Sequence, residues 1–324
     1  MSKHVAIIVL NWNGKEDTRK CLISLQALTY SHVEIFIIDN GSTDGSKEVF
    51  RKEFPTLRLI ETKVNLGYAG GNNVGIEIAL KEEFDFVFVL NNDTVVDPGI
   101  VEAFLSGFSE AKVGILGAKI YRMDEPNRLD HLGGLWNPKK IDFDYVGYRA
   151  MDGEKYSCSK ELDYVCGAAL MMRREVLEKV GLFDPRFFLF WEEADFCFRA
   201  RRAGFLVKNC PEAKVWHKIS ASFTGGKPHA AYFIWRGRLL WIEKNFSGAK
   251  KFFYFARLLG GKFPAFFFSK QMRKVQLLLQ KCAGKDTQRN KVRIQQIDAA
   301  LCGMQDYLFK RFYAGRSKNF MNCD

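Results

Sequence analysis

Short apolar runs separated by amphipathic stretches constrain the fold of this chain more than any other feature. The runs are rich in Val, Ile and Phe, which is typical of strands buried on both faces of a sheet. They lie at residues 4–10, 33–38, 84–90 and 113–118. Between the first two runs, residues 15–28 have apolar side chains at helical spacing. This alternation predicts an α/β fold with a doubly wound, mainly parallel sheet.

Two regions depart from this alternation. Residues 121–160 are irregular and rich in Asp, Gly, Asn and Tyr, so we expect a long loop over the sheet there. After residue 229, Phe, Trp, Tyr, Lys and Arg dominate, and residues 230–280 are expected to form two or three helices. The change in composition predicts a helical C-terminal region that differs in character from the α/β part.

Polar side chains follow three of the predicted strands. Asn11 and Asn13 come directly after the first, Asp39 ends the second, and Asn91-Asn92-Asp93 follow the strand at residues 84–90. Open α/β sheets bind their ligands at the carboxyl ends of the strands, so we expect a ligand site at these residues. A carboxylate such as Asp93, together with diphosphate oxygens and water, can hold a hard divalent cation.

A second acidic cluster lies at Glu192, Glu193 and Asp195. Together with Asp93 it suggests a metal–diphosphate site that faces a catalytic base. Simpler explanations remain open, because acidic residues favour helix N-termini in any protein. Asp195 and Arg199 also have the four-residue spacing of a helical ion pair.

The net charge of +12 is unevenly distributed. Residues 1–195 contain 23 Lys and Arg against 31 Asp and Glu, a net charge of −8, so the remainder carries +20. A region this basic favours an anionic partner, either nucleic acid or a membrane surface. Residues 252–268 interleave aromatic side chains with Lys and Arg, which suits a segment lying in a membrane interface. We expect peripheral contact with an anionic membrane face and no nucleic acid. A helical subdomain packed on the catalytic core is the alternative.

The eight cysteines contain no C-x-x-C pair, which disfavours a zinc site. The first four residues lead directly into a short apolar run, unlike a signal peptide. Scattered cysteines without an export signal are typical of a reduced, cytosolic protein. We therefore expect a cytoplasmic protein at the inner face of the plasma membrane.

An ordered set of motifs resembles the family 2 glycosyltransferases, and within them the bacterial rhamnosyltransferase-like group. In chain order the motifs are Val5–Gly14, Ile38–Ser46, Asn65–Gly67, Gly70–Asn73, Leu90–Thr94 and Trp191–Asp195. The resemblance implies a GT-A fold, a nucleotide-binding α/β domain, over residues 1–245, followed by a basic, aromatic-rich helical region at 246–324. It also implies inverting transfer of a sugar from a nucleoside diphosphate donor.

The resemblance assigns several residues to donor nucleotide binding. They are Asn11, Asn13, Asp39, Asn65, Gly67, Gly71, Asn72 and Asn92. In similar enzymes the residue that matches Asp39 accepts a hydrogen bond from the base. An Asx turn or a helix cap is the alternative for Asp39, because Asp-Asn-Gly-Ser is prone to turn. Exposed N–H groups of the glycine-rich loop at 65–73 favour phosphate, although most such loops are only turns.

The resemblance also implies Asp93 and His217 as ligands of Mg²⁺ or Mn²⁺. The family's acidic pair is usually D-x-D, and Asn91 replaces the first acid here. A histidine ligand favours Mn²⁺ over Mg²⁺. The alternatives are a strand-end cap for Asp93 and an ordinary core or surface residue for His217.

On the acceptor side, Glu193 matches the catalytic base of similar enzymes, and Glu192 is the fallback. The family's signature there is Glu-Asp, so the longer Glu193 is a departure. A base opposite the leaving diphosphate inverts the anomeric carbon. Further candidates for acceptor contact are Gly167, Trp136, Trp191 and Tyr148, while Arg236 and Arg238 are candidates for diphosphate or lipid headgroups. For the aromatic residues a core position is the alternative, and for the arginines a solvated helix face.

These expectations combine into one function. By resemblance the donor is dTDP-L-rhamnose first, with UDP- and GDP-sugars open, and the acceptor is a lipid-linked or polysaccharide glycan such as O-antigen of lipopolysaccharide. One alternative is a nucleic-acid- or membrane-binding protein that uses the basic tail. A sugar nucleotidyltransferase is disfavoured, because Asn11-Trp12-Asn13-Gly14 replaces the Gly-rich loop with Arg expected after its first strand. A dinucleotide dehydrogenase is disfavoured because no G-x-G-x-x-G follows the first strand.

Overall fold

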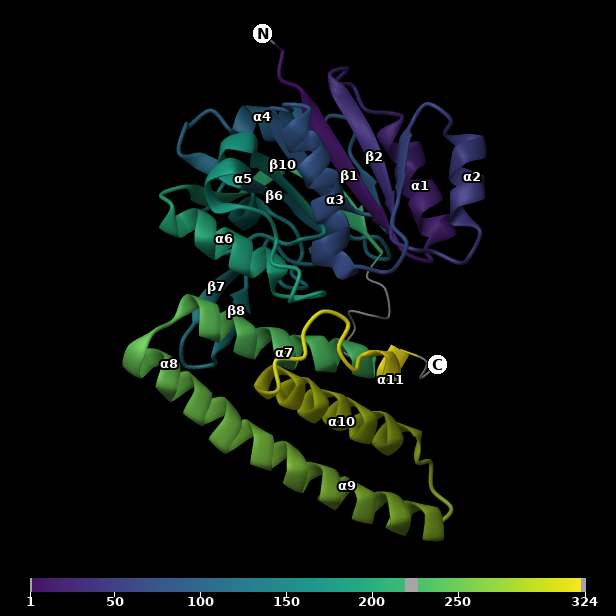
Figure 1. Cartoon of the computed structure of the whole chain (residues 1–324), viewed down its shortest axis with the longest axis vertical. Coiled ribbons are helices and arrows are strands. Elements are labelled where there is room, and N and C mark those ends of the chain that lie inside the picture. The colour runs from purple at the N-terminus through teal and green to yellow at the C-terminus, as the bar shows by residue number, and fades with distance from the viewer. Residues whose placement is uncertain (1, 219–226, 322–324) are drawn as a thin grey trace. The chain divides into compact units, whose positions relative to one another are not determined.

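The computed structural model describes residues 2–218 and 227–321 of the 324-residue chain (Figure 1). The chain folds as two units. The first comprises Met1–Asp184 and Glu193–Ile219, and the second comprises Pro185–Glu192 and Ser220–Asp324. The division into domains at residue 245 stays a prediction.

The first unit is built on an eight-stranded sheet with the order β3-β2-β1-β4-β9-β6-β10-β5. Its strands are β1 (Val5–Asn11), β2 (Val33–Asp39), β3 (Arg58–Glu61), β4 (Phe86–Asn91), β5 (Thr94–Val96), β6 (Val113–Arg122), β9 (Ala169–Arg173) and β10 (Leu206–His217). Strands β3, β2, β1 and β4 are parallel, as are β6 and β10. Strand β9 is antiparallel to β4 and β6, and β5 to β10. The predicted α/β fold with a mainly parallel sheet is confirmed.

Helices cover both faces of this sheet. They are α1 (Lys15–Leu25), α2 (Ser46–Glu53), α3 (Gly67–Lys81), α4 (Ile100–Gly107), α5 (Arg174–Val180) and α6 (Glu192–Arg202). Alternate residues of β1, among them Val5 and Val9, pack in one core with α1 and α4. Ile8 points to the other face, where it meets α3 at Gly75. The period-two alternation of strand side chains therefore builds a separate layer on each side.

The close approach of α3 to β1 depends on glycine. A Cβ added at Gly71 would lie 2.4 Å from Cδ1 of Leu10, and one at Gly75 would lie 2.9 Å from Cγ2 of Ile8. Both distances are too short for carbon atoms, so the helix can pack at this depth only where no side chain intervenes. This packing brings the N-terminal end of α3 to the carboxyl end of β1.

Strand β10 continues through a proline. Pro211 lies within the strand and lacks a backbone donor. The structure continues the strand to His217 by means of a register shift between Cys210 and Lys214, where β10 runs beside β6. Such a bulge lets a strand tolerate proline and continue. It delivers His217 to the strand ends.

The long loop predicted at residues 121–160 contains regular structure. A two-stranded antiparallel hairpin forms from β7 (Gly134–Asn137) and β8 (Asp142–Tyr145), and a short 3₁₀ turn follows at Glu154–Tyr156. The hairpin strands are four residues each, which is too short for periodicity to be visible in the sequence.

The second unit is helical. It contains α7 (Pro228–Asn245), α8 (Gly248–Phe255), a π-helical segment (Ala256–Lys262), α9 (Phe263–Cys282), α10 (Gln288–Leu308) and α11 (Lys318–Met321). In Figure 1, α8, the π-helical segment and α9 follow one another as one long rod, and α10 lies between this rod and α7. Of the 20 residues of α9, none is buried. Among the described helices, none combines the length and apolarity needed to cross a bilayer.

Candidate active site

The ends of β1 and β2 are joined by a buried hydrogen-bond network around Asn11 and Asp39, which lie opposite each other in the parallel register. The Asn11 amide donates to Oδ2 of Asp39 at 2.9 Å, to Oγ of Ser42 at 3.0 Å and to Oγ of Ser46 at 2.9 Å. Both Asn11 and Asp39 are fully buried. The network fixes the shape of the two loops that follow these strands.

Asp39 also accepts a hydrogen bond from the turn that follows it, but from the third residue on and not from the second, as an Asx turn requires. The backbone N–H of Ser42 donates to its Oδ1 at 3.0 Å. Asn13 lies on the adjacent loop with a positive φ of 50°, and its side-chain oxygen accepts from the Thr43 N–H at 2.8 Å. Asn13 is exposed, unlike Asp39. The structure thus brings the predicted nucleotide residues of both loops together, and a direct contact of Asp39 with a base stays a prediction.

A second network ties the β2 loop to the glycine-rich loop, and its centre is Asn40. The Asn40 amide donates to Oδ1 of Asn65 at 3.0 Å and to the carbonyl of Gly67 at 3.1 Å. Its oxygen accepts from the N–H of Leu66 at 2.9 Å. Sequence reasoning missed Asn40, although its place between Asp39 and Gly41 in the turn motif was the available signal.

The other predicted donor residues take different positions. Asn72 is fully buried and donates to the carbonyl of Tyr68 at 3.0 Å. Gly71 serves the packing of α3 on β1 described above. Asn92 donates from its amide to Oγ1 of Thr18 at 2.7 Å, and Thr18 in turn donates to Asn11. Asn92 therefore belongs to the same strand-end network as Asn11.

Asp93 and His217 are neighbours, as the sequence predicts. Oδ1 of Asp93 lies 3.1 Å from Nε2 of His217. The other ring nitrogen, Nδ1, lies 3.5 Å from Oδ2 of Asp130. Strand β5 pairs with β10 so that Thr94 lies opposite His217, which places the residue before it beside the imidazole. Sequence reasoning missed Asp130, which comes from the irregular region after β6.

The two carboxylates govern the protonation of His217. Burial of the imidazole lowers its pKa, but hydrogen bonds to Asp130 and Asp93 outweigh this effect and raise the pKa of His217 to about 9. Burial raises the pKa of Asp130, and the hydrogen bond to His217 with nearby positive charge outweighs it, so the pKa lies below its usual value. Without a metal, a protonated His217 lies between two carboxylates.

The Asp93–His217 pair fits a divalent cation. Two adjacent ligands of an octahedral ion at ~2.1 Å are ~3 Å apart, and the measured separation of Oδ1 and Nε2 is 3.1 Å. A carboxylate behind the second ring nitrogen, as Asp130 provides, is the usual support of a metal-binding histidine. Among the described residues, no group of three or more His, Cys, Asp or Glu side chains could hold a metal. Asp93 and His217 would thus fill two coordination positions of the cation and leave the others to oxygens of the sugar donor and to water.

Glu193 lies in the first turn of α6, next to Gly167. A Cβ added at Gly167 would lie 3.5 Å from Cγ of Glu193 and 3.2 Å from the hydroxyl of Tyr68. Tyr68 donates to the Gly167 carbonyl at 2.5 Å. The carbonyl of the next residue, Ala168, accepts from the N–H of Asn91 at 2.8 Å. The Gly167–Ala168 segment therefore connects the strand end that carries Asp93 to the helix that carries Glu193.

The pKa of the buried Cys166 thiol responds to carboxylates of both acidic clusters. Burial raises the pKa of Cys166 well above its usual value, and the negative charges of Asp130, Glu193 and Asp93 raise it further. All three carboxylates are thus near enough to act on one atom of the first unit.

Asp195 in the same helix has a structural role, whereas Glu192 stays a candidate for the base. Asp195 is fully buried and accepts from Nε of Arg199 at 2.9 Å, which confirms the predicted helical ion pair. Arg199 also donates to the carbonyl of Leu182 at 2.7 Å. Glu192 is buried at the first position of α6.

The candidate acceptor aromatics lie in different parts of the structure. Trp136 is in β7, where its ring packs edge-on against Phe143 with centroids 5.3 Å apart. Trp191 belongs to the second unit, where it is buried with its ring 5.5 Å from that of Trp241 and beneath the guanidinium of Arg238. Tyr148 is exposed in the first unit.

The solvated helix face considered for Arg238 and Arg236 is wrong, because both side chains are buried; Arg236 is the more deeply buried of the two. Its side chain is fully buried in the second unit and donates to the carbonyl of Phe187 at 3.0 Å. Its guanidinium lies 5.2 Å from the centroid of the Tyr232 ring and 5.0 Å from that of Phe233. Burial together with these contacts makes Arg236 a structural residue of the helical unit.

Comparison with solved structures shows the GT-A fold. A mannosyltransferase from Pyrobaculum calidifontis, solved with GDP-Man and Mn²⁺, matches with a TM-score of 0.57 at 14% identity over 96% of this chain and 88% of its own. GalNAc-T7, solved with UDP, GalNAc and Mn²⁺, matches with a TM-score of 0.59 at 12% identity over 78% of this chain and 50% of its own.

Comparison of sequences gives the family. The chain belongs to glycosyltransferase family 2, since residues 3–238 match the family described as "Glycosyltransferase like family 2". It is 28% identical over 286 residues to the N-acetylglucosaminyl-diphospho-decaprenol L-rhamnosyltransferase of Mycobacterium tuberculosis, covering 76% of this chain and 91% of the relative. It is 24% identical over 250 residues to the low-salt glycan biosynthesis hexosyltransferase Agl10 of Haloferax volcanii, covering 76% and 78%.

Proposed function

We propose that this protein is an inverting, metal-dependent glycosyltransferase that moves a sugar from a nucleoside diphosphate to a hydroxyl of a lipid-linked or polysaccharide acceptor in cell-envelope glycan synthesis. One observation carries the proposal. Asp93 with His217, and Glu193 through Gly167, approach the same carboxyl ends of the sheet from different elements.

The donor is proposed as dTDP-L-rhamnose. The support is the rhamnosyltransferase from Mycobacterium tuberculosis, whose similarity covers 91% of that protein. UDP- and GDP-sugars are the competing donors, since solved proteins of the same fold contain UDP or GDP-Man. The diphospho-decaprenol in the relative's name likewise supports a lipid-linked acceptor.

On the donor side, the loops held by the Asn11 and Asn40 networks would bind the nucleotide. Asp93 and His217 would hold Mg²⁺ or Mn²⁺, and Asp130 would orient the imidazole. When bound, such an ion neutralises the negative charge that develops on the departing diphosphate. The networks keep the loop backbones rigid before the donor arrives, which reduces the entropy cost of binding.

On the acceptor side, Glu193 would accept the proton of the attacking hydroxyl. The acceptor oxygen then bonds to the anomeric carbon while the bond from that carbon to the diphosphate oxygen breaks, and the electron pair leaves with the diphosphate. Attack on the face opposite the leaving group inverts the configuration. Because Gly167 has no side chain, Glu193 and Tyr68 both lie close to its backbone. Trp136 and Trp191 stay candidates for stacking on sugar rings.

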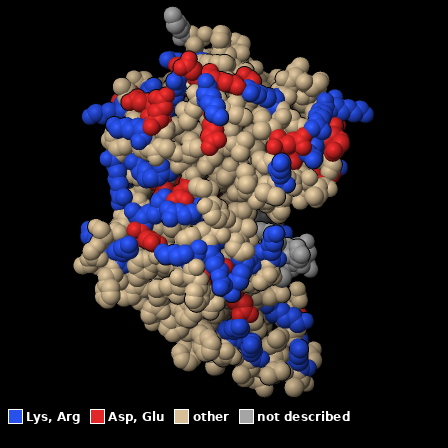
Figure 2. Space-filling model, viewed as in Figure 1, with Lys and Arg blue, Asp and Glu red and all other residues tan. Residues whose placement is uncertain are grey.

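Peripheral contact with an anionic membrane is proposed through the rod formed by α8 and α9. Large apolar side chains are exposed along it: Phe252, Phe253, Phe267, Phe268, Met272, Val275, Leu278 and Leu279. In Figure 2 the surface over this rod is largely free of charge, and basic residues gather towards the end of α9 and over α10. Residues 246–324 contain 16 Lys and Arg against 4 Asp and Glu. An apolar face combined with positive charge fits a helix lying in the plane of an anionic membrane surface.

Hydrolysis of the donor tests the assigned site. We expect the full chain to hydrolyse its nucleotide sugar slowly, and a chelator, Asp93→Ala or Glu193→Gln to lower the rate at least tenfold. The matched control is Glu110→Gln, which replaces an exposed carboxylate of the first unit and should keep the wild-type rate. Unchanged turnover in both site variants would reject the assignment, and a loss in Glu192→Gln alone would move the base to Glu192.

Co-sedimentation tests the partner of the basic region. We expect binding to phosphatidylglycerol vesicles and none to a 20-nucleotide DNA at the same ionic strength. Steeply salt-dependent DNA binding without vesicle binding would favour the nucleic-acid alternative.

A further inference from the structure

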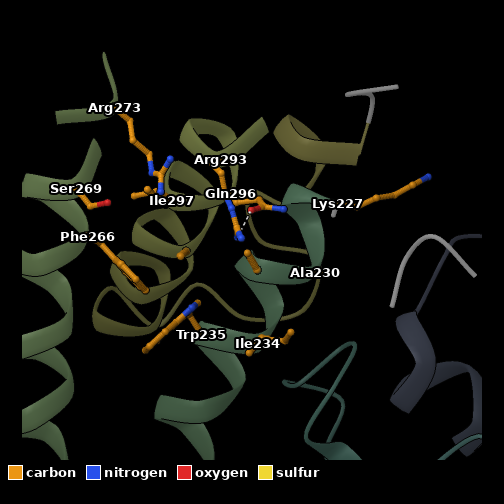
Figure 3. A pocket seen from close by; sticks show the side chains of 12 residues that line it. Lys227, Ala230, Ile234, Trp235, Phe266, Ser269, Arg273, Arg293, Gln296 and Ile297 are labelled. Carbon is orange, nitrogen blue, oxygen red and sulfur yellow. Dashed lines mark hydrogen bonds between the residues drawn. The ribbon is translucent and has the colours of Figure 1, made fainter. Parts of the chain in front are cut away.

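A cavity of about 320 Å³ lies within the second unit, between α7, α9 and α10 (Figure 3). Its two ends differ in chemistry. At one end Trp235 and Phe266 meet edge to face with ring centroids 4.9 Å apart, and Ile234 and Ala230 continue the apolar wall. At the other end are the guanidinium groups of two arginines, Arg273 from α9 and Arg293 from α10.

The arginines are held by neutral partners. Nη1 of Arg273 donates to Oδ1 of Asn290 at 3.0 Å, and Nη1 of Arg293 donates to Oε1 of Gln296 at 3.0 Å. An adjoining recess of about 280 Å³ shares both arginines and adds Arg289. Among the described residues, no carboxylate lines either space, and none of the three arginines has an ion pair. Three like charges at one rim favour an anion.

We propose that this cavity binds an amphiphile with a phosphate head and a short apolar chain. The phosphate lies between Arg273 and Arg293, because the guanidinium fork matches phosphate oxygens better than any other cationic side chain. The chain lies against Trp235 and Phe266. A free inorganic phosphate would use only the cationic end, and an uncharged alkane only the aromatic end.

The size of the cavity limits the ligand. A volume of about 320 Å³ is at the lower end of sites for small molecules, so the cavity accommodates one short chain segment rather than a whole two-chain lipid. Two sources supply this chemistry: a lipid of the membrane surface, or a soluble single-chain phosphate such as a prenyl phosphate. The inference concerns the second unit alone and does not rest on sugar transfer, so either proposal can fail without the other.

Calorimetry on the full chain tests the site, with decyl phosphate below its micellar concentration as the probe. We expect decyl phosphate to bind, with decanol and inorganic phosphate each at least tenfold weaker. Loss of one charge-assisted hydrogen-bonding group weakens binding about tenfold. Arg273→Gln and Arg293→Gln should each show this loss, whereas Lys291→Gln, an exposed charge on α10 outside the cavity, should not.

A second variant separates binding from folding defects. Ser269→Phe fills the cavity without changing its charge, and it should abolish decyl phosphate binding while thermal unfolding stays as in the wild type. The arginine variants are also tested with phosphatidylglycerol vesicles: reduced capture identifies the bilayer as the source, and unchanged capture a soluble ligand. Three results would each overturn the proposal. Arg273→Gln could bind decyl phosphate as tightly as Lys291→Gln does, inorganic phosphate could bind as tightly as decyl phosphate, or Ser269→Phe could bind decyl phosphate normally.

Discussion

The pH dependence of metal binding tests the Asp93–His217–Asp130 arrangement directly. A metal binds the neutral imidazole, so it competes with the proton on His217. With a pKa of about 9, about 1% of the imidazole is neutral at pH 7.0 and about 24% at pH 8.5. The affinity of the metal-free protein for Mn²⁺ should therefore rise about 25-fold between these pH values, equivalent to about 2 kcal/mol.

The direction of this pH dependence and its physical cause can both be checked. Because the folded protein raises the pKa of His217 above its usual 6.5, affinity increases with pH until about 9 and then levels. Asp130→Asn removes a carboxylate that raises this pKa, so its affinity profile should be flatter between pH 7.0 and 8.5. The free Mn²⁺ signal in electron paramagnetic resonance measures the affinity, and Glu110→Gln serves as the control. A wild-type affinity that is independent of pH would refute the reasoning.

Three further predictions concern other parts of the chain. Gly75→Ala should lower the free energy of unfolding by about 1–3 kcal/mol in urea titration, because its Cβ would lie 2.9 Å from Cγ2 of the fully buried, β-branched Ile8; unchanged stability would contradict the packing argument. Asn40→Ala should lower the free energy of unfolding by about 2 kcal/mol, because it leaves buried groups without hydrogen-bond partners, and it should weaken nucleotide binding in a thermal-shift assay. A stability loss with full nucleotide affinity would limit Asn40 to a structural role. Phe267→Glu should reduce capture by phosphatidylglycerol vesicles, whereas Ile23→Glu, equally exposed in the first unit, should not; equal effects would exclude the α9 face.

Much of the site was predictable because its residues follow strands. The apolar runs identify β1, β2 and β4, and polar residues directly after a buried strand must lie at its carboxyl end. Asp130 was not predictable in this way. It lies in an irregular segment without periodicity, and its backbone returns to pair with Ile120 of β6. Only this return brings its carboxylate to His217.

In the helical unit, too, some features were predictable from the sequence and others were not. Its composition correctly indicated helices with a basic, aromatic character. The burial of Arg236 and the exposure of α9 beyond residue 268 were not predictable, because both depend on which helix packs against which. Arg236 is enclosed through contacts to Phe187 and Tyr232, whereas α9 has only one face covered.

The sequence by itself determined the elements and the polar residues at their ends, because hydrophobic periodicity and turn chemistry are local properties of the chain. The order of its motifs also determined the family. The tertiary structure decided which of those residues meet. Parallel pairing sets Asn11 opposite Asp39, and the insertion of antiparallel β9 brings Gly167 and Ala168 between Asn91 and Glu193. These contacts join residues 26 to 77 positions apart in the sequence, and no local pattern encodes a contact at that separation.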